Sequence, residues 1–179
     1  MGNVCEGQLK IRGKGQDIFK FFKECMQGVR NTYDENNWYI PIWVDLDKYE
    51  VDALANNDYK HYRPNIEYNN ITDIDHNRFY IKGNENIVIN GDFVTLRFFH
   101  SEMDEEIIKS LYISCDYSLK VEKLVELSEK YNLDFRFYGF DSSNEYNQEV
   151  EIIKGVIAKD EIIEYEDYNW ESPFNDIGG

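Results

Sequence analysis

Three cysteines and three histidines are the residues of this chain most suited to nucleophilic chemistry. A cysteine nucleophile needs a histidine at hydrogen-bonding distance to take its proton. Cys115 and His100 could approach each other across neighbouring strands, but their spacing does not require it. Cys25 falls on the core-facing side of a predicted helix and Cys5 opens a predicted strand, so we expect both to be packing groups. The wide spacing of the three cysteines predicts free thiols in a reducing cytoplasm.

Metal and phosphate sites are the next chemistry to consider. Asp73, Asp75 and His76 could supply oxygen and nitrogen ligands to a cation. The segment lacks the glycine and the distal glutamate of an EF-hand loop, so we expect a solvated loop. The stretch KIRGKG at 10–15 joins glycine and basic residues before a helix, as phosphate cradles do, but without either phosphate-loop spacing. We expect a strand-to-helix turn there, and no cofactor.

Carboxylates dominate the rest of the chain, which has 179 residues and a net charge of −16. Glu149 and Glu151, and likewise Glu164 and Glu166, are spaced i,i+2, which on a strand places each pair on one face roughly 6.7 Å apart. A hydrolytic carboxylate pair needs a cleft that nothing in the sequence indicates. We therefore interpret these acids as a surface rather than as a catalytic site.

The charge bias also limits the partners. A strongly acidic protein repels nucleic acid and anionic membranes and suits a basic partner. Residues 1–30 hold six Lys and Arg against three Asp and Glu, whereas residues 141–179 hold two against eleven, which predicts faces of opposite sign. No apolar run approaches the ~18 residues of a membrane span, and the N-terminus lacks a signal-peptide core. We expect a cytoplasmic protein.

The elements that must position these residues begin with a strand over 6–12 and an amphipathic helix over 16–27, ended near Gly28. Residues 29–77 hold nine asparagines and few clear elements, with Pro41 interrupting a strand-like run and a helical turn near 51–57. We interpret them as a functional insertion or a lid.

After the insertion, the pattern predicts strands within 78–101, a short helical turn at 104–111 and a strand at 111–116. A helix at 119–131, capped by Ser118, and a strand at 133–140 follow. The last predicted element is a hairpin within 148–170 that turns near 158–161. Without the insertion and the hairpin, the order is βαββαβ. The sequence thus predicts an α+β, ferredoxin-like antiparallel sheet with two helices on one face. We expect one domain over 1–171, with the insertion at 29–77, and a flexible tail at 172–179.

The N-terminal stretch MGNVCEGQLKIRG resembles the M-P-N-W-C-x-N-x-L-x-I-x-G opening of the YubB-type ferredoxin-like family, with Asn3, Cys5, Leu9, Ile11 and Gly13 matching. ISCDYSLK, a following helix and LDFRFYGF stand where that family has F-D-T-A-W-S-P-P, a helix and a strand, although both prolines and the N-W-G-x-K-W segment are missing. The resemblance covers about half of the chain. It implies a ferredoxin-like fold and a plasmid or phage origin, and carries over no catalytic residue.

Charge and origin together suggest a non-catalytic inhibitor of a host defence nuclease, of anti-CRISPR or anti-restriction type, that occupies a basic nucleic-acid-binding surface. Sixteen charges match roughly 27 Å of duplex at one charge per ≈1.7 Å. No single strand achieves that density, so several segments must converge with aromatic anchors. The expected contact residues are Asp104, Glu105, Glu106, Glu145, Glu149, Glu151, Glu164, Glu166, Tyr168 and Trp170. Two alternatives are a small regulatory or structural module whose acidity only solvates it, and an enzyme with an unrecognised site in the insertion.

Overall fold

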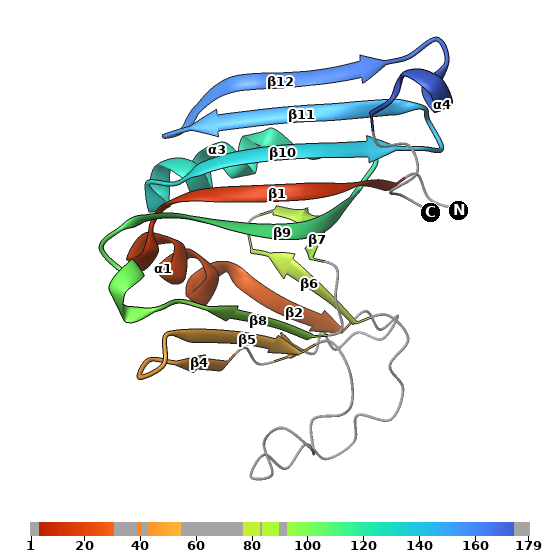
Figure 1. Ribbon diagram of the computed structural model, residues 1–179. Helices are drawn as coiled ribbons and strands as arrows, with labels where there is room; N and C mark the ends of the chain where they lie inside the picture. Colours follow the sequence, from red (N-terminus) through yellow and green to blue (C-terminus); the bar gives the residue numbers. More distant parts are fainter. Residues whose placement is uncertain are drawn as a thin grey trace.

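The computed structural model describes residues 4–30, 39–40, 43–54, 77–82, 84–89 and 93–173 (Figure 1). Their elements follow the order β1 (Val4–Lys14), α1 (Gly15–Cys25), β2 (Met26–Arg30), β3 (Tyr39–Ile40), β4 (Trp43–Asp45), β5 (Glu50–Leu54), β6 (Asn77–Ile81), β7 (Asn84–Ile89), β8 (Phe93–Arg97), the 3-10 helix η1 (His100–Glu102), β9 (Glu106–Asp116), α3 (Val121–Tyr131), β10 (Asp134–Asp141), β11 (Tyr146–Ile153), β12 (Val156–Glu164) and α4 (Tyr168–Glu171). The expected α+β class is confirmed.

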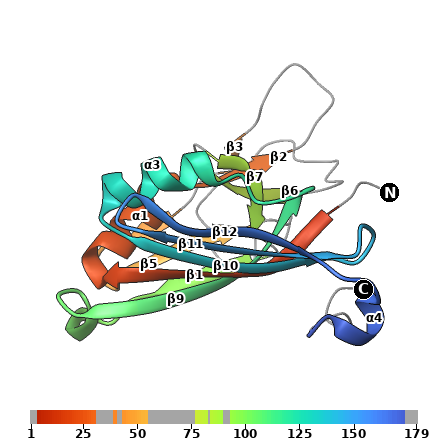
Figure 2. The same ribbon diagram turned by 90° about the horizontal axis from the view of Figure 1, so that it is seen from above.

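Two antiparallel sheets organise these elements. The large sheet has the strand order β12-β11-β10-β1-β9-β7-β6-β2-β3, and the small sheet has the order β4-β5-β8. Figures 1 and 2 show α1 and α3 on one face of the large sheet, as expected. On the opposite face, which we call the open face, the described residues place only the single turn α4, at one end against β11 (Figure 2).

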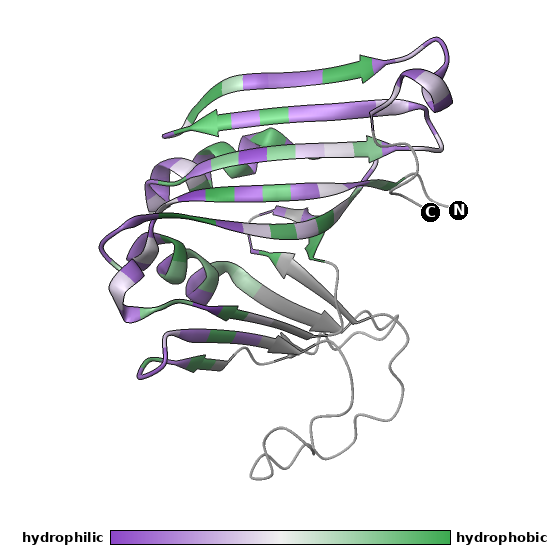
Figure 3. Ribbon diagram, viewed as in Figure 1, coloured by the Kyte–Doolittle hydropathy of each residue, from purple (hydrophilic) through white to green (hydrophobic). Residues whose placement is uncertain are grey.

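Alternation along the strands explains this arrangement. In β1 the buried residues include Cys5, Leu9 and Ile11, which point to the helices, whereas Lys10 and Arg12 point to the open face. Hydrophobic and hydrophilic residues alternate in the same way along the neighbouring strands (Figure 3). A strand with one apolar and one polar face is stable only at the boundary between core and solvent, so this pattern determines which face the helices cover.

Aromatic rings join α1 to its surroundings. Phe21 lies 5.6 Å from Phe135 of β10 and 5.5 Å from Tyr131 of α3, between ring centroids. Phe19 points to the small sheet, where it meets Phe98 at 5.4 Å. Such edge-to-face contacts add to the gain from apolar burial. The helix ends at Cys25, earlier than expected, and Met26 begins β2 directly.

The prediction of a helical turn at 104–111 is wrong. Residues Glu106–Asp116 form one continuous strand, β9, preceded only by the 3-10 turn at His100–Glu102. The whole of β1 pairs with β9, down to Lys14 opposite Glu106. The ladder of hydrogen bonds along β1 therefore overrides the local preference for a helix. The turn expected near 51–57 is likewise a strand from Glu50 to Leu54, which β8 pairs with.

The terminal hairpin is confirmed but turns earlier than expected. β11 and β12 are joined by Lys154 and Gly155, whose φ angles of 48° and 79° are both left-handed. A two-residue turn with both φ positive matches the twist of the flanking strands. The sequence feature that indicates this turn is Lys154-Gly155, which lies between two apolar runs.

The insertion and the tail lie partly outside the described residues. Within 29–77 the structure describes only 29–30, 39–40, 43–54 and 77, which include β3, β4 and β5. The candidate cation ligands Asp73, Asp75 and His76 lie outside the described part. At the C-terminus, Ser172 is buried and its amide donates to the carbonyl of Tyr168. The residue expected to begin the tail thus belongs to the packed structure.

Candidate functional site

The expected contact residues do not share one place in the fold. Glu106 pairs with Lys14 at the last residue of β1, so Asp104, Glu105 and Glu106 lie at one end of the strands. Glu145 lies in the turn between β10 and β11, at the opposite end. The structure therefore separates segment 104–106 from the residues around Glu145.

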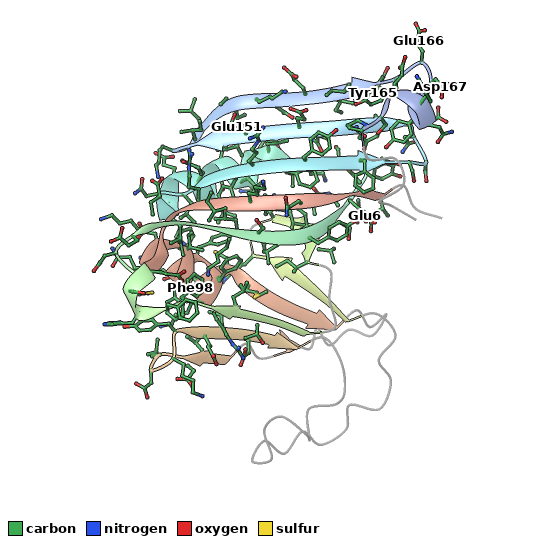
Figure 4. All side chains as sticks on the ribbon, in the orientation of Figure 1. Glu6, Phe98, Glu151, Tyr165, Glu166 and Asp167 are labelled. Carbon is green, nitrogen blue, oxygen red and sulfur yellow. The ribbon has the colours of Figure 1, made fainter. Side chains whose placement is uncertain are left out.

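Glu149 and Glu151 point to the open face of β11. Lys159, from the neighbouring strand, forms an ion pair with Glu149 and lies 3.2 Å from a carboxylate oxygen of Glu161. Glu149 is therefore largely neutralised by a lysine that sequence reasoning did not connect to it. Glu151 lies directly opposite Arg136, and Figure 4 shows it well along β11, away from Glu166.

Five exposed carboxylates do gather at the end of the sheet where β12 and α4 meet, and we call them the acidic end. Figure 4 shows Glu166 and Asp167 there together. Within the described part of the chain none of the five forms an ion pair, and residues 160–173 contain no lysine or arginine. The members of the acidic end are Glu145, Glu164, Glu166, Asp167 and Glu171.

Trp170 stands within the acidic end with 86% of its surface exposed. It lies on α4, a single turn that Asp167 caps by accepting from the Trp170 amide at 3.3 Å. An isolated turn of this length has no stability of its own. Its position must therefore come from contacts with the sheet.

Tyr168 supplies that contact, because it is buried rather than displayed. Its hydroxyl donates to Oδ1 of Asn147 on β11 at 3.0 Å. Nδ2 of Asn147, also fully buried, lies 2.9 to 3.2 Å from three hydroxyl oxygens. Since the side-chain amide has two hydrogens, it can donate hydrogen bonds to two of these three hydroxyl oxygens at a time. The three oxygens belong to Tyr138, Tyr165 and Ser172.

Sequence reasoning therefore identified Trp170 correctly as an exposed aromatic but missed Asn147. No local pattern indicates such a residue, because its four partners come from β10, the segment after β12, α4 and the residue after α4. Tyr168 positions the surface and does not form it. The resulting arrangement is a rigidly held, exposed tryptophan among carboxylates, which suits a lysine or arginine side chain through cation–π and ionic contacts.

The open face has a second feature, a row of charges across neighbouring strands. Lys10 of β1 lies directly opposite Arg136 of β10, and Arg136 directly opposite Glu151 of β11. Two adjoining shallow hollows share these three residues. Beside them, Arg12 holds Asp134 with two hydrogen bonds of 2.6 and 2.8 Å.

The three cysteines are free and buried, as expected of Cys5 and Cys25. Cys115 faces Cys5 across β1 and β9, and His100 lies before the opposite end of β9, stacked on Tyr49 at 5.6 Å. The structure therefore does not bring Cys115 and His100 together. In the described part of the chain no three His, Cys, Asp or Glu side chains converge as metal ligands.

Burial predicts that these thiols react slowly. It raises the pKa of Cys5 to about 12, and it raises the pKa values of Cys25 and Cys115 as well. At pH 8 the thiolate fraction of Cys5 is then about 10⁻⁴, against about 10⁻¹ for an ordinary thiol. We expect the folded protein to resist a thiol-reactive dye at pH 8, and all three thiols to react in denaturant. A native thiol that reacts as fast as free cysteine contradicts this.

The same burial makes stability depend on alkaline pH. The raised pKa means that the folded state keeps a thiol proton that the unfolded chain releases above pH 9, the ordinary pKa. The contribution of the buried thiol to the free energy of unfolding is therefore fully present below pH 9. It is lost as the pH rises from 9 toward 12. Denaturation followed across this range should show a falling free energy of unfolding.

The described residues include no helix both long and apolar enough to cross a membrane. Comparison of the chain with protein-family models, with curated proteins and with solved structures finds no match.

Proposed function

We propose that this chain is a non-catalytic binding protein that docks its acidic end on a basic protein surface. It belongs to a phage or other mobile element and acts in the host cytoplasm. There it blocks a nucleic-acid-binding nuclease of the host. The observation that carries the proposal is Trp170, exposed on a turn that the sheet holds in place. Glu166, Asp167 and Glu171 flank it in sequence and form no ion pair with any described residue.

The topology supports a ferredoxin-like assignment. β9 lies between β1 and β2, and β1 lies between β9 and β10, so the units β1-α1-β2 and β9-α3-β10 interleave. Interleaved βαβ units of this kind are the mark of ferredoxin-like sheets. The hairpin β6–β7 would then be an addition between β9 and β2. This arrangement agrees with the resemblance to the YubB-type family, which supplies the mobile-element origin.

The chemistry of the acidic end supports a basic partner. Tryptophan is enriched among residues that dominate binding energy, and it attracts lysine and arginine over its ring face. Exposed carboxylates without counter-ions steer a basic surface toward the site and lose that influence at high salt. Because α4 is already ordered, little conformational entropy is lost when the partner binds.

The test is capture from a lysate of cells that carry defence nucleases, with this protein immobilised, at about 0.1 M and about 1 M salt, where the Debye lengths are about 10 and 3 Å. We expect a nuclease to be retained at low salt, released at high salt and displaced by duplex DNA. Trp170→Ala, and separately Glu166→Lys with Glu171→Lys, should weaken the purified pair at least tenfold, a change of about 1.4 kcal/mol.

The matched control carries the same change in net charge on α3. Glu122 and Glu126 are exposed there, and their double replacement by lysine should leave binding within about twofold. Recovery of no nuclease at low salt, or equal weakening by the two charge variants, would overturn the proposal.

A further inference from the structure

Two neighbouring cations on the open face form no ion pair within the described part of the chain. Lys10 and Arg136 lie directly opposite each other on β1 and β10, both exposed, and neither forms an ion pair with a residue that the structure describes. The cations on either side differ. Arg12 lies 2.6 Å from Asp134, and Lys159 is held by two glutamates.

The contact between Lys10 and Arg136 opposes folding, because like charges placed directly opposite on antiparallel strands repel each other. Glu151 lies opposite Arg136 on β11 but forms no ion pair with it. The pair of cations is also unexpected in a chain with 35 acidic residues against 19 basic ones. A carboxylate at position 10 would complete a cross-strand ion pair with Arg136. Side chains that oppose folding and nevertheless stand together in a hollow are typical of binding sites.

The shape of the site narrows the ligand. Both hollows include Lys10, Arg136 and Glu151, and Gln8 and Tyr138 lie in the next row along the strands. A guanidinium beside an ammonium matches the oxygens of a phosphate group. Glu151 would repel an anion that covered it, but its carboxylate accepts a hydrogen bond from a hydroxyl group.

We propose that the open face binds a phosphate monoester, with the phosphate on Lys10 and Arg136 and a hydroxyl of the same molecule donating to Glu151. This site is separate from the acidic end and does not depend on the function proposed for it. Arg12 and Lys159 are occupied by their carboxylates, so the phosphate is centred on the unpaired pair.

The experiment is titration of the folded chain with inorganic phosphate, ribose 5-phosphate and ribose, followed by NMR chemical shifts. We expect saturable shifts on β1 and β10 with both phosphates, tighter for ribose 5-phosphate, and none with ribose. Glu151→Gln should reduce the advantage of ribose 5-phosphate over inorganic phosphate. Shifts that grow linearly without saturation indicate an adventitious ion only and overturn the proposal.

Lys10→Glu separates binding from folding. We expect it to weaken ribose 5-phosphate at least tenfold and, without ligand, to raise the melting temperature, because the new carboxylate faces Arg136. Lys20→Glu, the same charge change at an exposed position of α1, should leave affinity within about twofold. Equal weakening by both variants, or unchanged affinity in Lys10→Glu, overturns the site. A lowered melting temperature contradicts the repulsion on which the argument rests.

Discussion

Replacement of Gly7 by alanine is expected to lower the free energy of unfolding by about 3 kcal/mol, the upper part of the range for overpacking a core. Gly7 lies in the middle of β1 and faces Gly139 of β10 and Ile113 of β9. A Cβ at Gly7 would lie 2.5 Å from the Cα of Gly139 and closer still to the carbonyl oxygen of Tyr138. Both obstacles are backbone, so no rotamer change relieves them and the pairing of two central strands must shift.

Chemical denaturation measures this effect, with Gln8→Ala as the control. Gln8 is the next residue of the same strand and points to the open face, so its replacement should change stability by no more than about 0.5 kcal/mol. A loss below about 1 kcal/mol for Gly7→Ala would show that β1 and β10 separate easily. The close approach of the two strands would then have no energetic importance.

The elements with a clear period were predictable from sequence. The strand at 6–12, the helix from residue 16 and the helix over 119–131 all show apolar residues on one side only, and the structure contains all three as β1, α1 and α3. Their burial is decided within each element by side-chain alternation. The boundaries were less accurate, because β1 extends to Lys14 and α1 begins at the next residue. Likewise α3 begins only at Val121, after Lys120, so Ser118 does not cap it.

What could not be predicted depends on pairing between distant segments. Asp104, Glu105 and Glu106 are typical early acids of a helix start, yet a strand begins at Glu106 because the end of β1 needs a partner. The neighbours of Arg136 depend on the registers of three strands. A register shift of one residue would move the Arg136 side chain from the open face to the helix-covered face. For the same reason sequence spacing did not place Asp104–Glu106 at the opposite end from Glu145.

Glu166 shows the same limit on a smaller scale. Its spacing from Glu164 predicts a shared strand face, but β12 ends at Glu164 and Asp167 already caps α4. The acidic end therefore depends on the position of α4 more than on the strand. Asn147 determines that position, which makes it the most informative single substitution.

Asn147→Leu is expected to lower the free energy of unfolding by about 3 kcal/mol and to release α4. Leucine is similar in size but offers no hydrogen bond, so the buried hydroxyl of Tyr168 loses its acceptor, and two further hydroxyls lose a donor. Each buried polar group left unsatisfied costs about 1–3 kcal/mol. The amides of Trp170 and Ser172, which bond within the turn, should exchange with deuterium much faster than in the native chain.

Two companion variants decide whether this effect is local. Tyr168→Phe removes a single hydroxyl and should cost about 1 kcal/mol, with a smaller gain in exchange at Trp170. Gln148, the next residue of β11, points to the opposite face, and its side chain makes two hydrogen bonds with the backbone of Leu119. Gln148→Leu removes these two bonds. It should destabilise the protein without selectively speeding exchange in α4. If Gln148→Leu and Asn147→Leu speed exchange there equally, Asn147 does not hold the turn, and the rigid display of Trp170 loses its structural basis.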